Sequence, residues 1–391
     1  MKPLVILGSG LAGYSVAREF RKLDRDTPLL IVTTDDGSFY AKPMLSNALS
    51  LKKTPAALAN ADAAAMASQL NATILTHRRV AAIAPPTREI VLHARAGGPL
   101  ERFGYARLVL ALGAEPRRAQ LAGDGAGDVL CVNDLGDYHR FRDTLDGCRS
   151  VAVLGAGLVG CEFANDLVAS GYIVSVIDPA ATPLARLLPE AAGQVLAQGL
   201  HESGICFHLG RSAIAVRKRE GGYVLAFADG GELEVDLVLS AIGLSPRVGL
   251  ARAAGLEVNH GVCTDAWCRT SAPDIYALGD CAEMDGQFRP YVLPIMHAAR
   301  ALARTLAGDP QRVVFPVMPV SLKTPASPAV IAMPAQASGA WSVAFHPHDV
   351  RNSVRAICAD PATGRTIGFA LVGSAVSDKA PLLQEMSALP P

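Results

Sequence analysis

The stretch Pro3–Gly13, PLVILGSGLAG, predicts a buried strand that turns sharply into a helix. The apolar run Leu4–Leu7 is short enough for a buried strand, and Leu11–Leu23 can continue as a helix. The turn between them has the pattern G-x-G-x-x-G, made by Gly8, Gly10 and Gly13. In such a turn the first glycine permits the tight bend, the second lets a pyrophosphate approach the backbone, and the third lets helix pack on strand. The helix N-terminus adds free N–H groups and partial positive charge, so the stretch is a candidate dinucleotide-binding site.

A second stretch, Val151–Gly160, repeats this pattern as VAVLGAGLVG. Its glycines are Gly155, Gly157 and Gly160. The next strand, Ile173–Ile177, ends at Asp178, about 20 residues after the first glycine, where a carboxylate is expected on the adenosine ribose. A carboxylate there repels a 2′-phosphate and favours NADH over NADPH; an acidic turn residue before Pro179 is the less favoured alternative. Two such turns in one chain indicate a flavoprotein that also binds a nicotinamide nucleotide.

The first repeat lacks an acidic residue at the end of its second strand, Leu29–Thr33. Thr33 and Thr34 come first, and Asp35 and Asp36 follow. The backbone and hydroxyl groups of the two threonines can therefore make the ribose or adenine contact, with Asp35 as the second choice.

The remaining pattern divides the chain into domains. The apolar strands Tyr105–Gly113 and Ser240–Arg247 each contain a glycine near their end, and they mark the exit from the first nucleotide domain and the return to it. Helices are expected over 55–70, 184–201 and 294–306, the last with proline at its start, where a missing N–H costs nothing. From Pro316 onward the pattern predicts a small α+β domain whose last ten residues are loosely ordered.

Composition excludes several classes of function. Lysine plus arginine equals aspartate plus glutamate at 36 each, which does not favour nucleic acid as a partner. No apolar run approaches the ~20 residues of a membrane span, and the chain begins directly with the glycine turn, so neither a membrane segment nor a signal peptide is expected. The eight cysteines make no C-x-x-C and no metal-ligand spacing. We therefore expect a cytoplasmic protein with mostly buried thiols and without a metal site.

Taken together, the motifs resemble those of the FAD/NAD(P)H disulfide-reductase-like proteins. They are GSGLAG at 8–13, LVLALGA at 108–114, GAGLVGCE at 155–162 and IYALGD at 275–280, in that order. Within that superfamily, YAKPMLS at 40–46, CEFANDL at 161–167 and MPVSLKTPASP at 318–328 resemble the rubredoxin–NAD(+) reductases. The resemblance covers essentially the whole chain.

This resemblance implies an α/β fold like that of glutathione reductase, with two Rossmann-like domains and a small α+β C-terminal domain. The FAD-binding domain would comprise residues 1–112 and 243–316, the NAD-binding domain 113–242, and the C-terminal domain 317–391. Residues at matching positions would bind FAD or border the flavin: Ser9, Gly10, Leu11 and Ala12 at the pyrophosphate, Thr33 and Thr34 near adenosine, Val80 through its backbone, and Lys42, Glu162, Asp280, Val292 and Lys323 near the flavin and its linker. Asp280 follows an apolar strand and can accept a ribitol hydroxyl. Val292 lies just before the helix at Pro294, whose N-terminus favours an anionic reduced flavin.

Two residues are the candidate catalytic pair. The resemblance implies that Lys42 and Glu162 form an ion pair beside flavin N5, where an ammonium favours the electron-rich reduced flavin and a carboxylate keeps the lysine charged. From spacing alone, a surface lysine and a helical glutamate would be equally reasonable.

The redox C-x-x-x-x-C of disulfide reductases is missing, because no cysteine precedes Cys131. Cys263 and Cys268 have that spacing but lie on the wrong element, just before TSAPDIY, so no redox disulfide is expected there. Electrons should leave from the flavin itself.

The expected function is electron transfer from NADH through FAD to rubredoxin, as in alkane hydroxylation or oxygen detoxification. Two alternatives remain: a ferredoxin reductase of an oxygenase system, and a flavin-bearing NADH sensor or scaffold.

Overall fold

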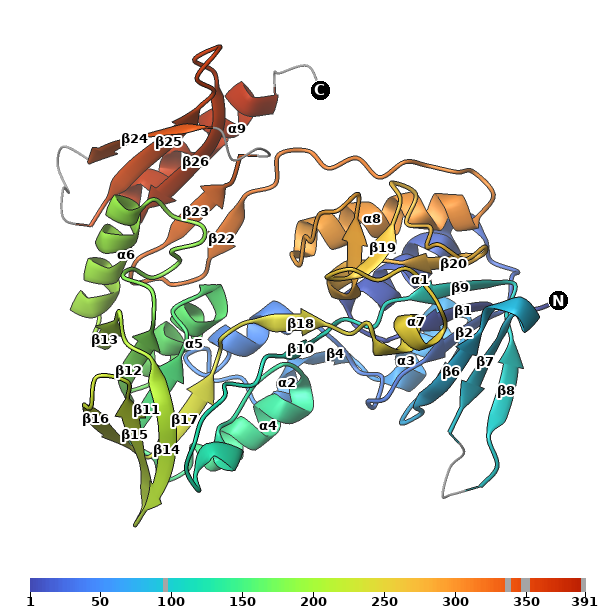
Figure 1. Ribbon diagram of the computed structural model, residues 1–391. Helices are drawn as coiled ribbons and strands as arrows, with labels where there is room; N and C mark the ends of the chain where they lie inside the picture. Colours follow the sequence, from blue (N-terminus) through green and yellow to red (C-terminus); the bar gives the residue numbers. More distant parts are fainter. Residues whose placement is uncertain (94–97, 335–338, 346–351, 388–391) are drawn as a thin grey trace. The chain divides into compact units, whose positions relative to one another are not determined.

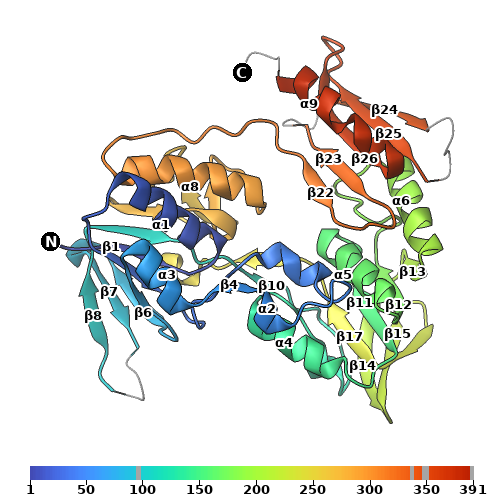
Figure 2. The same ribbon diagram turned by 180° about the vertical axis from the view of Figure 1, so that it is seen from behind.

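The computed structural model describes residues 1–93, 98–334, 339–345 and 352–387 (Figure 1; Figure 2, from behind). The chain forms two compact units. The first contains Met1–Lys42, Ala56–Glu115 and Leu244–Phe315, and the second contains Pro43–Pro55, Pro116–Gly243 and Pro316–Pro391. The chain thus leaves the first unit and returns to it twice.

The first unit is built on a five-stranded parallel sheet in the order β20-β9-β1-β2-β5. These strands are β1 (Leu4–Leu7), β2 (Leu29–Val32), β5 (Thr73–Leu75), β9 (Arg107–Leu110) and β20 (Ile275–Ala277). The central strand β1 pairs with β2 on one side, Leu4 opposite Leu29, and with β9 on the other, Leu4 opposite Arg107. All four residues of β1 are buried, as the apolar run predicts for a central strand.

Both faces of this sheet are covered. Helices α1 (Leu11–Leu23) and α8 (Val292–Leu306) pack side by side, with α3 (Ala63–Leu70), on the face formed by Leu4 and Ile6. On the opposite face, Val5 and Leu7 pack against the antiparallel sheet β6 (Val80–Ala84), β7 (Glu89–Leu92) and β8 (Glu101–Gly104), and against α7 (Gly249–Ala253). This layering leaves the carboxyl ends of the parallel strands as the edge where a ligand can bind.

The second unit repeats this plan with four parallel strands in the order β13-β12-β11-β17. They are β11 (Ser150–Leu154), β12 (Ile173–Asp178), β13 (Ile205–Leu209) and β17 (Leu237–Ser240). Helix α5 (Leu158–Ala169) packs on β11 and β12, and α4 (Leu135–Thr144) contacts α5 through Phe141 and Phe163. The antiparallel sheet β14 (Ala213–Arg219), β15 (Gly222–Phe227) and β16 (Glu232–Val235) shares a core with Ala152 and Leu154 of β11.

The C-terminal part of the second unit is an antiparallel sheet in the order β22-β23-β26-β25-β24. Its strands are β22 (Val320–Leu322), β23 (Ala329–Ala332), β24 (Ala340–Phe345), β25 (Val354–Ala359) and β26 (Thr366–Val372). Helix α9 (Lys379–Ser387) packs on β26 through Leu382 and Met386. Helix α6 (Glu190–Glu202) contacts β13 and also β25 and β26, so it joins the parallel sheet and the C-terminal sheet of this unit (Figure 1).

The shorter elements lie mainly in the connections. They are β3 (Phe39–Tyr40), η1 (Lys42–Asn47), α2 (Pro55–Leu58), β4 (Ala59–Ala61), η2 (Pro85–Thr87), β10 (Ala114–Pro116), η4 (Ala126–Asp128), β18 (Leu244–Pro246), β19 (Val262–Thr264), η5 (Gly279–Cys281), β21 (Ala282–Met284) and η6 (Gly373–Asp378).

Four sequence-based expectations about these elements were wrong. The helix expected over 55–70 is interrupted by β4, and Asp62 caps α3 by accepting a hydrogen bond from the Ala65 amide at 2.7 Å. The helix expected from 184 begins only after Pro189, and the helix expected at Pro294 begins two residues earlier, at Val292. The last ten residues were expected to be loose, yet those up to Ser387 are helical because the apolar side of α9 packs on the sheet; residues 388–391 lie outside the described residues.

Candidate nucleotide-binding sites

The first glycine turn has the backbone that a dinucleotide requires. Gly8 has φ +113°, a conformation that residues with a side chain rarely adopt. A Cβ on Gly13 would overlap the carbonyl oxygen of Gly8, so helix and strand approach as closely as the sequence predicts. At Gly10, by contrast, no described heavy atom lies within 4 Å of where a Cβ would stand. The second glycine therefore faces open space, as a position reserved for a pyrophosphate should.

Polar groups gather beside this turn at the end of β2. The Ser9 hydroxyl lies 2.8 Å from the Thr33 hydroxyl and donates to the Asp35 carboxylate at 2.9 Å. Asp35 also accepts from the Thr33 hydroxyl and, at 3.0 Å, from the Gly37 amide. The structure thus brings together Ser9 and Thr33 with Asp35, which the sequence ranked second, while Thr34 is exposed.

The second glycine turn repeats this geometry. Gly155 has φ +102°, a Cβ on Gly160 would overlap the Gly155 carbonyl oxygen, and Gly157 faces open space. Asp178, the last residue of β12, accepts hydrogen bonds from the Ala156 amide at 2.6 Å and the Ala180 amide at 2.7 Å. The acidic residue therefore lies against the glycine turn, where the sequence placed the adenosine ribose.

The other residues predicted at FAD in the first unit lie on several elements. Lys42 begins η1, Val80 begins β6, Asp280 is in η5, and Val292 is the first residue of α8. Burial raises the pKa of the Asp280 carboxyl, and the positive charge of Lys42 partly opposes that shift. The charge of Lys42 therefore favours the ionised form of Asp280.

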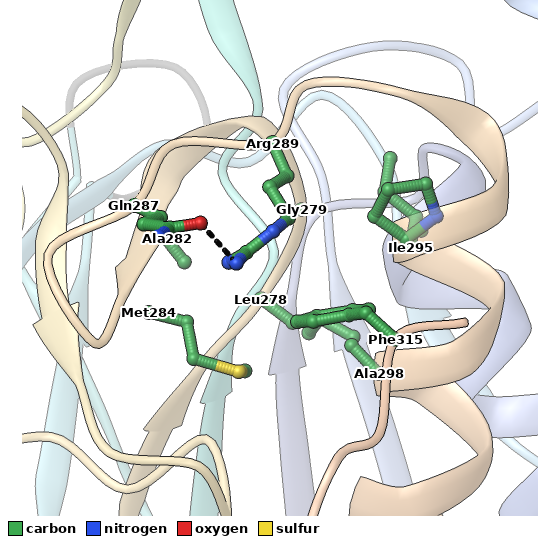
Figure 3. Close-up of a pocket in the computed structure, with 10 residues that line it drawn as sticks. Leu278, Gly279, Ala282, Met284, Gln287, Arg289, Ile295, Ala298 and Phe315 are labelled. Carbon is green, nitrogen blue, oxygen red and sulfur yellow. Dashed lines mark hydrogen bonds between the residues drawn. The ribbon is translucent and has the colours of Figure 1, made fainter. Parts of the chain in front are cut away.

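A small pocket beside α8 contains none of the predicted site residues (Figure 3). It is lined by Leu278, Gly279, Ala282, Met284, Gln287, Arg289, Pro294, Ile295, Ala298 and Phe315. Arg289 donates to the Gln287 side chain, and its guanidinium lies 4.6 Å from the centre of the Phe315 ring. Gly279, next to Asp280, is so close to Ala12 that a Cβ there would stand 2.8 Å from the Ala12 Cβ. The pocket thus borders the backbone that presents Asp280 and the first glycine turn.

Glu162 is the centre of a polar cluster within the second unit. Its side chain is only 7% exposed and accepts from the Ser46 hydroxyl at 2.6 Å and from the Lys323 ammonium at 3.0 Å. The Lys323 backbone amide donates to the other carboxylate oxygen at 3.0 Å, and the Lys323 ammonium also donates to the Pro43 carbonyl. The pairing of Glu162 with Lys42, which belongs to the first unit, stays a prediction.

Sequence reasoning missed two residues of this region, Ser46 and Asp166. Both stand inside motifs that carried the family resemblance, YAKPMLS and CEFANDL, but neither position alone indicates a role. Asp166 accepts from the backbone amides of Leu49 and Ser50, each at 2.9 Å. These bonds explain why residues 43–55, expected in the FAD-binding domain, belong to the second unit.

The cysteines of the described chain are free thiols, Cys263 and Cys268 included. Cys268 is fully buried, and burial raises the pKa of its thiol. Burial also raises the pKa of the Cys161 thiol to about 12. A protonated, buried thiol is a poor nucleophile, so neither of these groups is suited to thiol exchange.

Both turns fit a dinucleotide. Each has a close glycine contact, a glycine facing open space and an aspartate beside it, Asp178 at the end of β12 and Asp35 three residues after β2. In the first unit Asp280 and the N-terminus of α8 would serve the flavin end of such a ligand.

Comparison with known proteins agrees with this geometry. The chain belongs to the pyridine nucleotide-disulphide oxidoreductase family, whose model matches residues 2–304. Residues 312–386 match a second model, described as a rubredoxin binding C-terminal domain. The two cofactors predicted from the sequence, FAD and NADH, agree with this family and are confirmed.

Curated relatives extend over the whole chain. It is 46% identical over 393 residues to a rubredoxin-NAD(+) reductase of Alcanivorax borkumensis, with 100% of each chain covered. It is 46% identical over 346 residues to the protein of the same name from Acinetobacter baylyi, covering 87% of this chain and 88% of that one. A nitric oxide reductase FlRd-NAD(+) reductase of Vibrio vulnificus is 36% identical, with 98% of both covered. The predicted resemblance is confirmed.

Solved structures support the fold. A ferredoxin reductase from Rhodopseudomonas palustris matches with a TM-score of 0.87 at 25% identity, covering 99% of this chain and 96% of that one. The predicted fold class, two Rossmann-like domains with a small C-terminal domain, is confirmed. In the part of the chain that is described, no helix is long and apolar enough to cross a membrane.

Proposed function

We propose that this protein oxidises NADH and passes the electrons through FAD to rubredoxin. The observation that carries the proposal is the joint presence of two dinucleotide turns and a C-terminal part that matches a rubredoxin-binding domain. The relatives named rubredoxin-NAD(+) reductase, 46% identical along the chain, support the same reaction.

The two units would supply two separate nucleotide-binding sites. In the first unit, amides of the Gly8–Gly13 turn would hold the FAD pyrophosphate and Asp280 would accept a ribitol hydroxyl. In the second unit, the Gly155–Gly160 turn would hold NADH, with Asp178 at the adenosine ribose. FAD, when bound, accepts hydride from NADH and releases electrons singly, as a one-iron acceptor requires.

Lys42 and Glu162 are the proposed groups at the reacting atoms. An ammonium near flavin N5 stabilises negative charge that develops on reduction. Glu162 is buried and held by Ser46 and Lys323, so groups of the protein itself fix the orientation of its carboxylate. A fixed carboxylate lowers the reorganisation needed when hydride moves.

A ferredoxin of an oxygenase system is the second candidate acceptor. The ferredoxin reductase of Rhodopseudomonas palustris shares the fold across 99% of this chain. The C-terminal match and the higher identity of the rubredoxin reductases favour rubredoxin.

Steady-state turnover with purified acceptors tests the proposal. With NADH and FAD-loaded protein, rubredoxin should be reduced with a kcat/KM at least about tenfold above that of a [2Fe–2S] ferredoxin, a difference of roughly 1.4 kcal/mol. Preference for ferredoxin would reassign the acceptor. A long-lived reduced protein that turns over poorly with both would support a sensor or scaffold instead.

We further propose that the protein works in the cytoplasm, where NADH is available, and serves alkane hydroxylation or oxygen detoxification. Cell fractionation tests the location, and growth of a deletion strain on alkanes or under oxygen stress tests the two pathways.

A further inference from the structure

Helix α5 presents two buried carboxylates to residues 43–55. Glu162 accepts from the Ser46 hydroxyl, and Asp166 stands four residues later on the same helix. Residues four apart on a helix share one face, so the two carboxylates act on neighbouring parts of one segment. Asp166 is 2% exposed and accepts from the amides of Leu49 and Ser50 and from the Ser50 hydroxyl.

The bonds to Asp166 use both of its oxygens. One accepts from the Leu49 amide, and the other accepts from the Ser50 amide and hydroxyl. Hydrogen bonds to a charged acceptor are stronger than neutral ones, and a buried carboxylate is tolerated only when its oxygens are satisfied in this way. Residues 42–47 form a 3-10 turn, followed by further turns, so the segment has little regular structure of its own. Asp166 is therefore the main polar anchor of this segment on α5.

We propose that Asp166 is a positioning residue for flavin reduction by NADH. By holding Leu49 and Ser50 on α5, it fixes the short turn that precedes them. Ser46 then stands where its hydroxyl donates to Glu162, and the Glu162 carboxylate keeps one orientation. The inference rests on the proposed role of Glu162 at the flavin, and it assigns Asp166 no contact with either nucleotide.

The chain offers a matched control for a purely structural role. Asp236, in the same unit, accepts from the amides of Arg149 at 2.8 Å and Ser150 at 2.9 Å. These amides lie where β11 begins, whereas the glycine turn follows its other end. Asp236→Asn therefore perturbs a carboxylate that holds two backbone amides in the same unit, here through one oxygen and beside Arg219, without touching the Glu162 cluster.

The test measures flavin reduction by NADH in stopped flow, without any acceptor, together with thermal unfolding. Asp166→Asn keeps the side-chain volume but puts an NH2 group, which can only donate, in place of one of the two accepting oxygens. It should slow flavin reduction about five- to tenfold with FAD still bound, whereas Asp236→Asn should change the rate less than about twofold at a similar loss of Tm. Equal rates in the two variants at equal loss of Tm would overturn the proposal.

A double-mutant cycle adds a readout that a structural role would not move. Because Asp166 acts through Ser46, Ser46→Ala with Asp166→Asn should reduce flavin no more slowly than the slower single variant. If the rate defects of the two single variants multiply in the double variant, Asp166 does not act through Ser46. If Asp166→Asn does not fold, Ser50→Ala removes only the hydroxyl bond and should slow reduction about twofold, with an unchanged rate counting against the proposal. Since no rubredoxin is present, failure of the proposed acceptor would not alter these results.

Discussion

The two glycine turns have the same backbone conformation, but different groups pack against the helix that follows each turn. Gly8 and Gly155 both have positive φ, and Gly13 and Gly160 both lie against the preceding turn. Behind the first turn, helix α1 packs along α8, and the position that corresponds to Glu162 is Ser15, whose hydroxyl lies 3.4 Å from the Met296 sulfur.

Behind the second turn, the corresponding face of α5 is charged. The carboxylates of Glu162 and Asp166 accept hydrogen bonds from Ser46, Leu49, Ser50 and Lys323. On α1 the position corresponding to Asp166 is Glu19, which pairs with Lys22 on its own helix. The glycine pattern thus fixes the turn, while residues up to two helical turns farther on decide whether the helix packs as a core element or carries reactive groups.

The largest expected effects come from substituting the third glycine of each turn. A Cβ on Gly13 or Gly160 meets a backbone oxygen that has little freedom to move. Gly13→Ala should yield protein without bound FAD. Gly160→Ala should keep FAD but raise the KM for NADH by more than about tenfold, a loss of roughly 1.4 kcal/mol.

Flavin absorbance of the purified proteins and steady-state kinetics measure both results. Gly10→Ala and Gly157→Ala control for the packing effect alone: their Cβ atoms would meet no described protein atom, so thermal unfolding should be unchanged, and any loss of nucleotide reports a Cβ in the space kept for the pyrophosphate. The assignment of one nucleotide to each turn is wrong if Gly160→Ala, and not Gly13→Ala, loses FAD.

The next effect concerns Lys42 and Glu162. Lys42→Met should slow flavin reduction by NADH about tenfold or more and lower the flavin potential, because an ammonium near N5 stabilises the reduced flavin. Glu162→Gln should show a smaller defect of the same kind, since it removes a buried charge that Ser46 and Lys323 now hold.

Glu19→Gln is the control on the other helix. Its pair with the largely exposed Lys22 contributes about 0–1 kcal/mol at most, so this variant should behave like the unaltered protein. Stopped-flow reduction that is unchanged in both Lys42→Met and Glu162→Gln would remove these residues from the reaction.

A smaller effect distinguishes Asp178, beside the second glycine turn, from Asp35, beside the first. Asp178→Ala should narrow the preference for NADH over NADPH about tenfold, roughly 1.4 kcal/mol, because the negative charge facing a 2′-phosphate is lost. Asp35→Ala should instead weaken FAD retention, since it frees the Ser9 and Thr33 hydroxyls beside the first turn. Kinetics with both nucleotides and FAD titration of the apoprotein measure the two outcomes. Equal use of NADH and NADPH by the unaltered protein would show that Asp178 has another role.

Sequence patterns predicted correctly those strands and helices whose bounds depend only on residues close in the sequence. The strand Leu4–Leu7 and the helix 11–23 have the expected bounds, because apolar periodicity and glycine spacing are properties of short stretches. The helix 55–70 failed because alanine-rich sequence has a high helix propensity, and only the cap at Asp62 and the pairing of β4 with β3 reveal the break.

Only part of the candidate site could be predicted from the sequence. Glycines and strand-end carboxylates follow a spacing that sequence displays. Ser46 and Asp166 are separated from their partners by more than 110 residues, and nothing local shows that Asp166 binds the Leu49 amide. Lys323 entered the prediction through the family resemblance, yet its bond to Glu162 became visible only in the folded chain.

The smallest expected effect concerns thiols, and it tests whether either half of the molecule relays electrons through sulfur. Cys161, on α5, corresponds to Tyr14 on α1, and its Sγ donates to the Ala156 carbonyl within the turn. Cys161→Ala and the double change Cys263→Ala with Cys268→Ala should leave rubredoxin reduction within about twofold of the unaltered protein. The physical reason is that Cys161 and Cys268 are buried with raised thiol pKa values, so they supply almost no thiolate, and a thiol relay needs one. Some loss of stability, about 1 kcal/mol for each buried sulfur, is expected from the cavities and is measured separately by thermal unfolding. Rubredoxin turnover that collapses in variants with full flavin absorbance would contradict direct transfer from the flavin and would place a cysteine on the electron path.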